Sequence, residues 1–125
     1  MFAGKRPTQL GVKNGKLASC PGTPNCVNSQ SNNPQSKIAP LPPVAIAQLK
    51  QTIESMERTK IVKETEDYLY AEFTSQMMGF VDDVEFYRDP TENVIHVRSA
   101  SRLGQSDLGA NRQRVETLRQ KLSQL

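Results

Sequence analysis

The chain has 125 residues, enough for one domain, and a formal net charge of +3. No apolar run approaches the roughly 20 residues needed to span a bilayer. The first seven residues lack the apolar segment of a secretory signal. We therefore expect a cytoplasmic protein without a membrane span.

The charge is distributed unevenly along the chain. Residues 1–53 carry six basic and no acidic side chains, residues 54–97 carry four basic and eleven acidic ones, and residues 98–125 carry six basic and two acidic ones. A nucleic-acid-binding protein more often has a dense basic stripe with interleaved aromatic residues. Because the acidic block would repel phosphates, we do not expect nucleic acid as a partner.

Residues 1–43 are predicted to be irregular. Seven of the eight prolines lie there, separated by Asn, Ser, Gln and Gly, and this composition favours turns and extended loops. We expect residues 1–16 to form a mobile N-terminal segment and residues 17–125 to form a single domain.

Two helices are predicted, one before and one after a group of strands along the chain. Apolar residues at spacings of three and four indicate a first helix from about residue 43 to residue 57, beginning after a Pro-Pro pair. A second apolar stripe indicates a last helix that ends near Ser123 and begins near Ser106 or Asp107, either of which can cap its free N–H groups.

Four strands are predicted between the helices, over residues 60–64, 68–75, 80–88 and 94–99. Short turns between them favour an antiparallel meander. With helices on one face and solvent on the other, the chain is assigned to the α+β class. The core is expected to include Leu49, Ile53, Leu69, Ala71, Phe73, Val84, Phe86, Ile95, Val97, Val115, Leu118 and Leu122.

Three motifs in this order resemble a known family. They are Cys20-Pro21-x-x-Pro24-Asn25-Cys26-Val27-x-Ser29-Gln30, the segment Gly79–Phe86 and the block Val94–Arg114. Over most of residues 17–122 the chain resembles the uncharacterised family called domain of unknown function 1499. The resemblance implies one small domain in which the three motifs meet, and it implies no biochemical activity.

Cys20 and Cys26 are the only cysteines, separated by five residues. Reduced, packed thiols are the interpretation that fits a cytoplasmic protein. A disulfide that closes the loop is the second, and a metal site that also uses His96, the only histidine, is the third. The spacing is wider than that of the usual zinc knuckle. We expect a structural pair that holds no tightly bound metal.

Three further polar residues lie in predicted elements. Asp82 shares a strand face with apolar residues, so either a bulge turns it outward or it pairs with a base, Arg98 or Arg102. We expect the second, an inward ion pair that fixes the sheet against the last helix. His96 is expected on the more exposed strand face, as a surface residue or a hydrogen-bonded one rather than a base. Asn111 interrupts the apolar stripe of the last helix, where it must be hydrogen-bonded or must contact a ligand.

The junction between the last strand and the last helix is the candidate site. Guanidinium groups, hydroxyls and free helix N–H groups can together bind an anion. We expect Arg102 and Arg112 to hold it near the helix N-terminus, where the Asp107 carboxylate competes for the same donors. The residues expected to bind the ligand are Arg98, Ser99, Ser101, Arg102, Asp107, Asn111 and Arg112.

The chain contains no P-loop, dinucleotide-binding or zinc-protease motif, and its serines lack a nucleophile motif. We expect no cofactor and assign no catalytic residue. The leading interpretation is a non-enzymatic module that binds an anionic small molecule or an acidic partner segment. One alternative is an enzyme with an arginine clamp that uses Asp82 or His96 for proton transfer. Another is a scaffold whose arginines serve only internal ion pairs.

Overall fold

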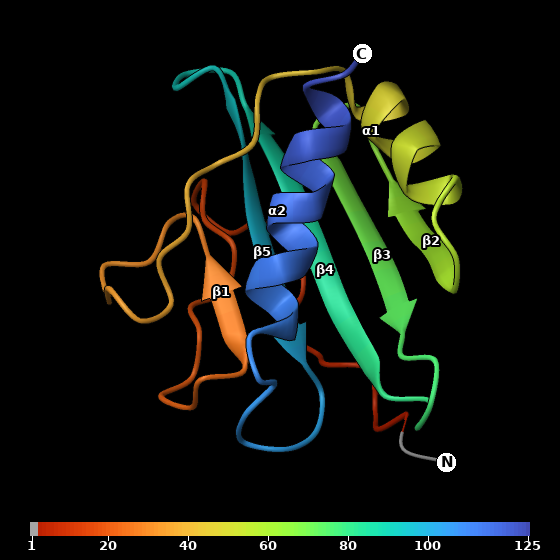
Figure 1. The fold of residues 1–125 in the computed structure, drawn as a ribbon. Coiled ribbons are helices and arrows are strands. Elements are labelled where there is room, and N and C mark those ends of the chain that lie inside the picture. Colours follow the sequence, from red (N-terminus) through yellow and green to blue (C-terminus); the bar gives the residue numbers. More distant parts are fainter. Residues whose placement is uncertain (1–2) are drawn as a thin grey trace.

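The computed structural model describes residues 3–125 as one five-stranded antiparallel sheet with two helices on one face (Figure 1). The strand order is β1-β5-β4-β3-β2. The predicted α+β class is confirmed. In chain order the elements are β1 (Cys26–Asn28), α1 (Ile46–Glu54), β2 (Thr59–Glu64), β3 (Tyr68–Thr74), β4 (Val81–Asp89), β5 (Val94–Ser101) and α2 (Ala110–Leu122).

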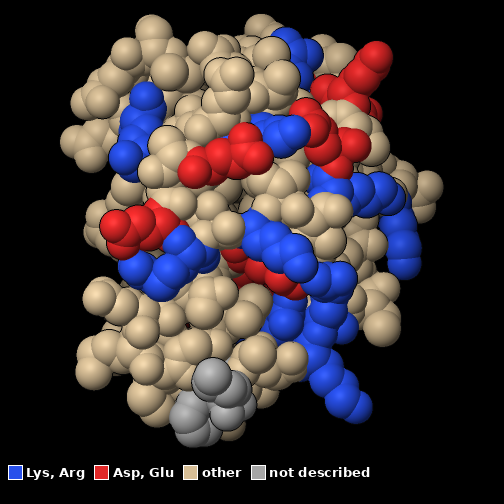
Figure 2. All heavy atoms as spheres, turned by 90° about the vertical axis from the view of Figure 1, so that its right-hand side faces the viewer, with Lys and Arg blue, Asp and Glu red and all other residues tan. Residues whose placement is uncertain are grey.

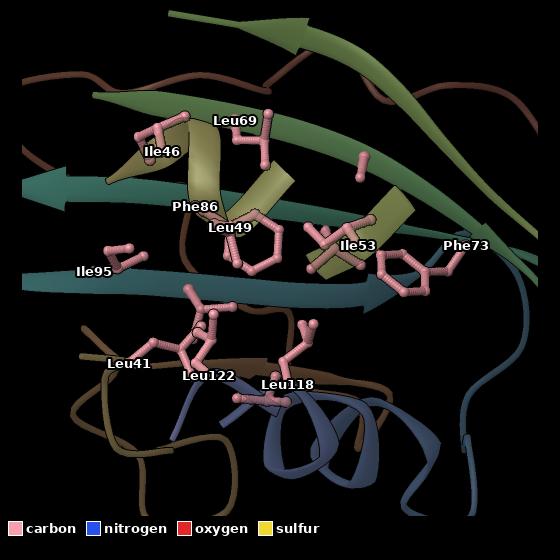
Figure 3. Packing of buried hydrophobic residues seen from close by; sticks show 14 of the residues in the cluster. Leu41, Ile46, Leu49, Ile53, Leu69, Phe73, Phe86, Ile95, Leu118 and Leu122 are labelled. Atoms are coloured by element: carbon pink, nitrogen blue, oxygen red, sulfur yellow. The ribbon is translucent and has the colours of Figure 1, made fainter. Parts of the chain in front are cut away.

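The main core lies between the helices and the sheet (Figure 3). Leu49 and Ile53 of α1 and Leu118 of α2 pack there against Phe86 of β4 and Ile95 of β5, and all five residues are fully buried. Every residue that the sequence predicts for the core is buried. The alternation in β3, β4 and β5 therefore identifies the correct inner face of the sheet.

Both helices begin about three residues later than predicted. Ala45, just before α1, is still extended, with φ −63° and ψ 145°. Before α2, Gly109 has φ +84°, a left-handed conformation that glycine adopts without strain. Asp107 caps the free N–H groups as expected, since its carboxylate accepts hydrogen bonds from the backbone N–H groups of Gly109 and Asn111 at 2.8 and 3.0 Å.

The three-residue strand β1 is absent from the sequence prediction. It pairs antiparallel with β5 along one edge of the sheet, with Cys26 opposite Ala100. A strand this short within a Pro- and Asn-rich loop carries no alternation of apolar and polar residues.

The second face of the sheet is not solvated, contrary to expectation. The N-terminal segment crosses this face, and Leu10 and Val12 pack against the buried Tyr68 and Tyr70. The backbone N–H of Gly11 donates to a carboxylate oxygen of a buried glutamate of β4 at 2.6 Å. A polar layer therefore lies between the sheet and residues 3–20. The predicted mobility of residues 1–16 stays a prediction, and residues 1–2 lie outside the described part of the chain.

Candidate functional site

The predicted junction site is divided between the two faces of the sheet. Successive residues of a strand point to opposite sides. Arg98 therefore lies beneath the N-terminal segment with Arg102, which follows the strand end, and Ser99 and Ser101 face α2. The seven predicted ligand-binding residues do not form one cluster.

The half that faces α2 is a hydrogen-bonded network centred on Asn111, which is fully buried. Asn111 Oδ1 accepts hydrogen bonds from Ser99 Oγ at 2.6 Å and from Arg114 Nη1 at 2.8 Å. Its Nδ2 donates to Ser101 Oγ at 2.9 Å and to an Asp107 carboxylate oxygen at 2.7 Å. These polar groups satisfy one another, so they tie the helix to the sheet.

Asp82 forms the inward ion pair that the sequence predicts, but with a different partner. Its carboxylate lies 2.8 Å from Arg114 Nη2, so the expected pairing with Arg98 or Arg102 is wrong. Arg114 also stacks on Phe73, with the guanidinium carbon 5.0 Å from the ring centroid. The expected role is confirmed, because this pair joins β4 to the last helix.

Arg112 and Arg102 do not meet. Arg112 donates to the backbone carbonyls of Lys37 and Gln35 at 2.9 and 3.0 Å, which ties α2 to the preceding loop. With Asp107 it lines a separate hollow of about 190 Å³.

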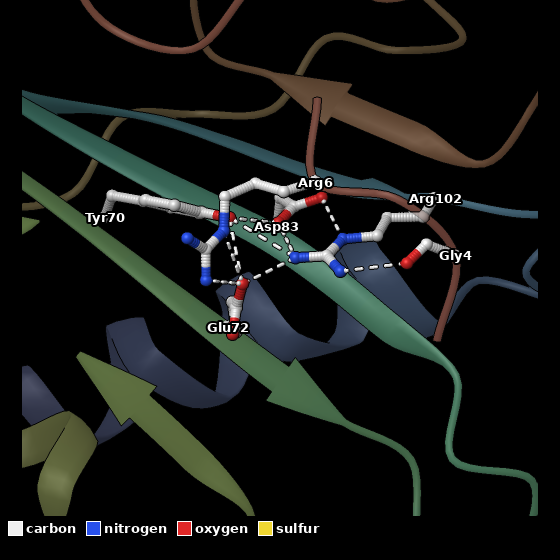
Figure 4. A network of polar contacts seen from close by, with 6 residues as sticks. All are labelled: Gly4, Arg6, Tyr70, Glu72, Asp83 and Arg102. Atoms are coloured by element: carbon white, nitrogen blue, oxygen red, sulfur yellow. Dashed lines mark hydrogen bonds and ion pairs between the residues drawn. The ribbon is translucent and has the colours of Figure 1, made fainter. Parts of the chain in front are cut away.

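Arg102 is held by two carboxylates on the opposite face (Figure 4). Its Nε and Nη2 each donate to Asp83 at 2.9 Å, and Nη2 also donates to Glu72 at 2.6 Å. Arg6 reaches the same Glu72 oxygen at 2.7 Å, and Tyr70 donates to Asp83 at 2.5 Å. The network joins the N-terminal segment to β3, β4 and the residue after β5. Arg102 therefore has carboxylate partners at both Nε and Nη2, and its charge is balanced within the network.

Electrostatics within this network follow from its hydrogen bonds. The hydrogen bonds to Asp83 raise the pKa of Arg102. Burial alone would raise the pKa of Glu72, but hydrogen bonds from Arg6 and Arg102 bring it below its ordinary value. Burial and the bond to Asp83 raise the pKa of Tyr70. Glu72 is therefore charged and the Tyr70 phenol is neutral at pH 7.

Arg98 differs from Arg102 in its surroundings. Its side chain is 4% exposed, and its Nη2 donates to the Ser19 carbonyl at 3.3 Å. Its Nε has no hydrogen-bond partner among residues 3–125. Glu85, its cross-strand neighbour, accepts hydrogen bonds at Oε2 from Tyr68 and from the Gly11 backbone. Burial lowers the pKa of Arg98, although an arginine stays charged.

Arg98 and Arg102 line the same cavity, of about 420 Å³. It lies between the N-terminal segment, the loop after Ser19 and the end of β5. Lys5 adds a third basic group and Asp83 the only carboxylate among the described lining residues, with Ser101 at the strand end. The sequence prediction misses Lys5, because residues 1–16 carry no pattern that docks them on the sheet.

Cys20 and Cys26 are joined by a disulfide. This is the second of the three interpretations of the pair, a disulfide that closes the loop. The leading interpretation, reduced thiols, is wrong. Cys20 lines the cavity and Cys26 lies in β1. The disulfide therefore fixes one wall of the cavity to the edge of the sheet.

His96 is on the predicted strand face but is buried, with 5% of its surface exposed. Its ring nitrogens contact Ser29 Oγ at 2.9 Å and a Glu92 oxygen at 2.5 Å. It is therefore a hydrogen-bonded residue, one of the expected alternatives, and it does not line the cavity.

Basic and acidic side chains are interleaved on the face of the molecule that Figure 2 presents, with most of the basic ones in its lower half. Opposite charges so arranged favour local pairing over a field of one sign. Neither helix in residues 3–125 is both long and apolar enough to cross a membrane.

Comparisons with curated proteins and with solved structures give no match. One family model, described as a protein of unknown function (DUF1499), matches residues 16–122 and therefore includes the disulfide, all five strands and both helices. The chain belongs to the DUF1499 family of proteins of unknown function.

Proposed function

We propose that the protein is a non-enzymatic module that binds a small anion, a carboxylate or phosphate compound, in the cavity beside Arg98. The observation that carries the proposal is the state of Arg98, which lines the cavity, is 4% exposed and has no partner for Nε within residues 3–125. Buried polar groups are nearly always hydrogen-bonded. A guanidinium binds carboxylate and phosphate groups well, so an anion in the cavity can meet the part of Arg98 that lines it. Glu85 Oε1, on the neighbouring strand, is likewise buried without a partner.

The volume and lining of the cavity support a small molecule over an acidic protein segment. About 420 Å³ falls in the range of cavities that enclose small ligands. Lys5 lines the cavity, is exposed and adds a positive charge, whereas Arg102 is already neutralised by Asp83 and Glu72. The ligand therefore meets Arg98 and Lys5 as its main cationic contacts.

An enzymatic role has less support. The two residues considered for proton transfer, Asp82 and His96, are bound to Arg114 and Glu92 respectively, and neither lines the cavity. Asp83 does line it, but accepts hydrogen bonds from Tyr70 and Arg102.

The scaffold alternative rests on one observation, the saturation of Arg102. With Arg6 and two carboxylates, Arg102 forms a closed network that joins the N-terminal segment to the sheet. If the whole polar layer serves this purpose, Arg98 contributes only its attraction to Glu85.

The expected cytoplasmic location stays a prediction. The Cys20–Cys26 disulfide favours an oxidising compartment instead, because cytoplasmic thiols are normally kept reduced. Thiol trapping in freshly fractionated cells distinguishes the two.

Isothermal titration calorimetry tests the proposal with inorganic phosphate and succinate as probes, at constant ionic strength. The wild type is expected to bind at least one probe, and Lys5→Gln to bind it several-fold more weakly. Arg98→Lys keeps the buried charge but loses the guanidinium, and is expected to bind at least tenfold more weakly. Lys13→Gln is the matched control, since Lys13 is exposed in the same segment and does not line the cavity.

If neither probe binds to the folded wild type, the proposal is overturned. Equal weakening by Lys13→Gln and Lys5→Gln would also overturn it, because that result indicates nonspecific attraction. If binding is absent while Arg102→Gln lowers the urea midpoint, the scaffold alternative is the correct one.

A further inference from the structure

The turn between β4 and β5 brings together the only histidine and two carboxylates. His96 Nε2 lies 2.5 Å from Glu92 Oε1 and 3.8 Å from Asp89 Oδ2. One ligand atom from each of the three residues falls within 4.8 Å of the others. None of the three lines the cavity beside Arg98, so this cluster is independent of the proposed anion site.

The turn itself fixes the two carboxylates. Asp89 Oδ1 accepts hydrogen bonds from the backbone N–H groups of Thr91 and Glu92 at 2.8 and 3.3 Å. This leaves Oδ2 directed toward His96. The Glu92 side chain is 62% exposed, whereas that of His96 is 7% exposed. The cluster is therefore rigid on the protein side and open to solvent at Glu92.

A second contact orients the imidazole. Ser29, just after β1, has its Oγ 2.9 Å from His96 Nδ1, and the same oxygen accepts a hydrogen bond from the Val97 backbone at 2.9 Å. When Nδ1–H donates to Ser29, the lone pair of Nε2 points at the two carboxylates. Metal-binding histidines are held in this way by a hydrogen bond at the nitrogen that does not bind the metal.

We propose that Asp89, Glu92 and His96 bind one divalent transition-metal cation, with Zn²⁺ as the reference ion. Imidazole nitrogen with carboxylate oxygen suits Zn²⁺ and its neighbours, whereas Mg²⁺ and Ca²⁺ prefer oxygen ligands alone. Three protein ligands at about 2.0–2.2 Å leave a fourth position for water or another ligand. The exposed Glu92 side chain can rotate to open the short contact with His96 and admit the ion.

Nuclear magnetic resonance of the imidazole nitrogens tests the proposal directly, because His96 is the single histidine of a chain without an affinity tag. On titration with ZnCl₂ we expect the Nε2 resonance to shift to a metal-bound value at one equivalent, while Nδ1 stays protonated against Ser29. Asp89→Asn and Glu92→Gln are each expected to weaken Zn²⁺ binding at least tenfold. Ser29→Ala is expected to weaken it about ten- to a hundredfold.

Glu66→Gln is the matched control, because Glu66 is an exposed carboxylate in the turn between β2 and β3. It is expected to leave Zn²⁺ affinity unchanged. A His96 resonance that Zn²⁺ does not move would overturn the proposal, as would binding through Nδ1. So would an unchanged affinity in the folded Glu92→Gln variant, whose substitution lies at an exposed position and leaves the core intact.

Discussion

Arg98 and Arg102 lie on the same face of the sheet but have different chemical surroundings. Arg102 is bonded to Asp83 and Glu72, which balance its charge. Arg98 has only a carbonyl hydrogen bond at 3.3 Å. Glu85 beside it is bonded to Tyr68 and Gly11 through Oε2, and its Oε1 has no hydrogen-bond partner in residues 3–125. An unsatisfied donor in a buried guanidinium is costly. This contrast is the physical reason for proposing Arg98, and not Arg102, as the ligand-binding residue.

At Asn111 a single amide organises the contact between α2 and the sheet. Asn111→Ala leaves the buried Ser99 hydroxyl without its acceptor and removes one of the two acceptors of Arg114 Nη1. We expect the free energy of unfolding to fall by about 3 kcal/mol, measured by urea denaturation. Gln113→Ala, exposed on the same helix, is the control and should change it by less than about 0.5 kcal/mol. Equal effects would show that the Asn111 network contributes nothing specific.

Elements in which apolar residues recur at a regular spacing could be predicted from the sequence. The strand β1, which has no such spacing, could not. Strict alternation identified β3, and the Asp89-Pro90 turn fixed the hairpin of β4 and β5. Local pattern carries no information on what covers the other sheet face. The position of residues 3–20 depends on hydrogen bonds to Glu72 and Glu85, which are far away in sequence.

The N-terminal segment is joined to β3 by Arg6 and Glu72, and this contact should depend on pH. The pKa of Glu72 is lowered in the folded protein. Its stabilising contribution is therefore present above the unfolded pKa of about 4.3 and is lost as pH falls through the folded value. We expect Glu72→Gln to cost about 1–2 kcal/mol at pH 7 and progressively less below about pH 4, in urea denaturation at each pH.

Glu57→Gln is the control for this pH dependence, because Glu57 forms an exposed ion pair with Arg58. Such pairs contribute little, so its effect should be small at every pH. A cost for Glu72→Gln that stays constant down to pH 3 would contradict the assignment of the stabilisation to the charged carboxylate. Hydrogen exchange at the Gly11 amide, bonded to Glu85, tests the predicted mobility of residues 1–16 in the same samples.

The Cys20–Cys26 disulfide joins the loop that lines the cavity to β1. A short closed loop gives a stabilisation of about 2 kcal/mol from chain entropy. The Cys20→Ser/Cys26→Ser variant should lose this amount in urea denaturation. It should also bind phosphate more weakly, because the Ser19 carbonyl next to Cys20 holds Arg98. Unchanged stability and unchanged binding would show that the disulfide is incidental to the site.

At the scale of the whole molecule, buried charged side chains and tyrosines form a polar layer between the sheet and the N-terminal segment. The sequence predicted that Arg98 and Arg102 belong to the site and that the family motifs meet there. It also predicted Arg112 and Asn111 as members of the same site. Alternation along β5 separates the two faces of the sheet. Arg98 and Arg102, beneath the N-terminal segment, line the cavity, whereas Arg112 and Asn111 do not. Lys5 and Cys20 join them through tertiary packing that no local pattern encodes.

Whether an anion binds beside Arg98 is tested by the resonance of the Arg98 Nε–H group in ¹⁵N-labelled protein. It is assigned by its loss in Arg98→Lys and followed during titration with inorganic phosphate and with succinate at constant ionic strength. If an anion binds beside Arg98, the Arg98 signal should show a saturable shift with at least one probe. The Arg102 Nε–H, bonded to Asp83, should shift much less. An Arg98 signal that neither probe moves, or a shift no larger than that of Arg102, would show that Arg98 does not bind the anion.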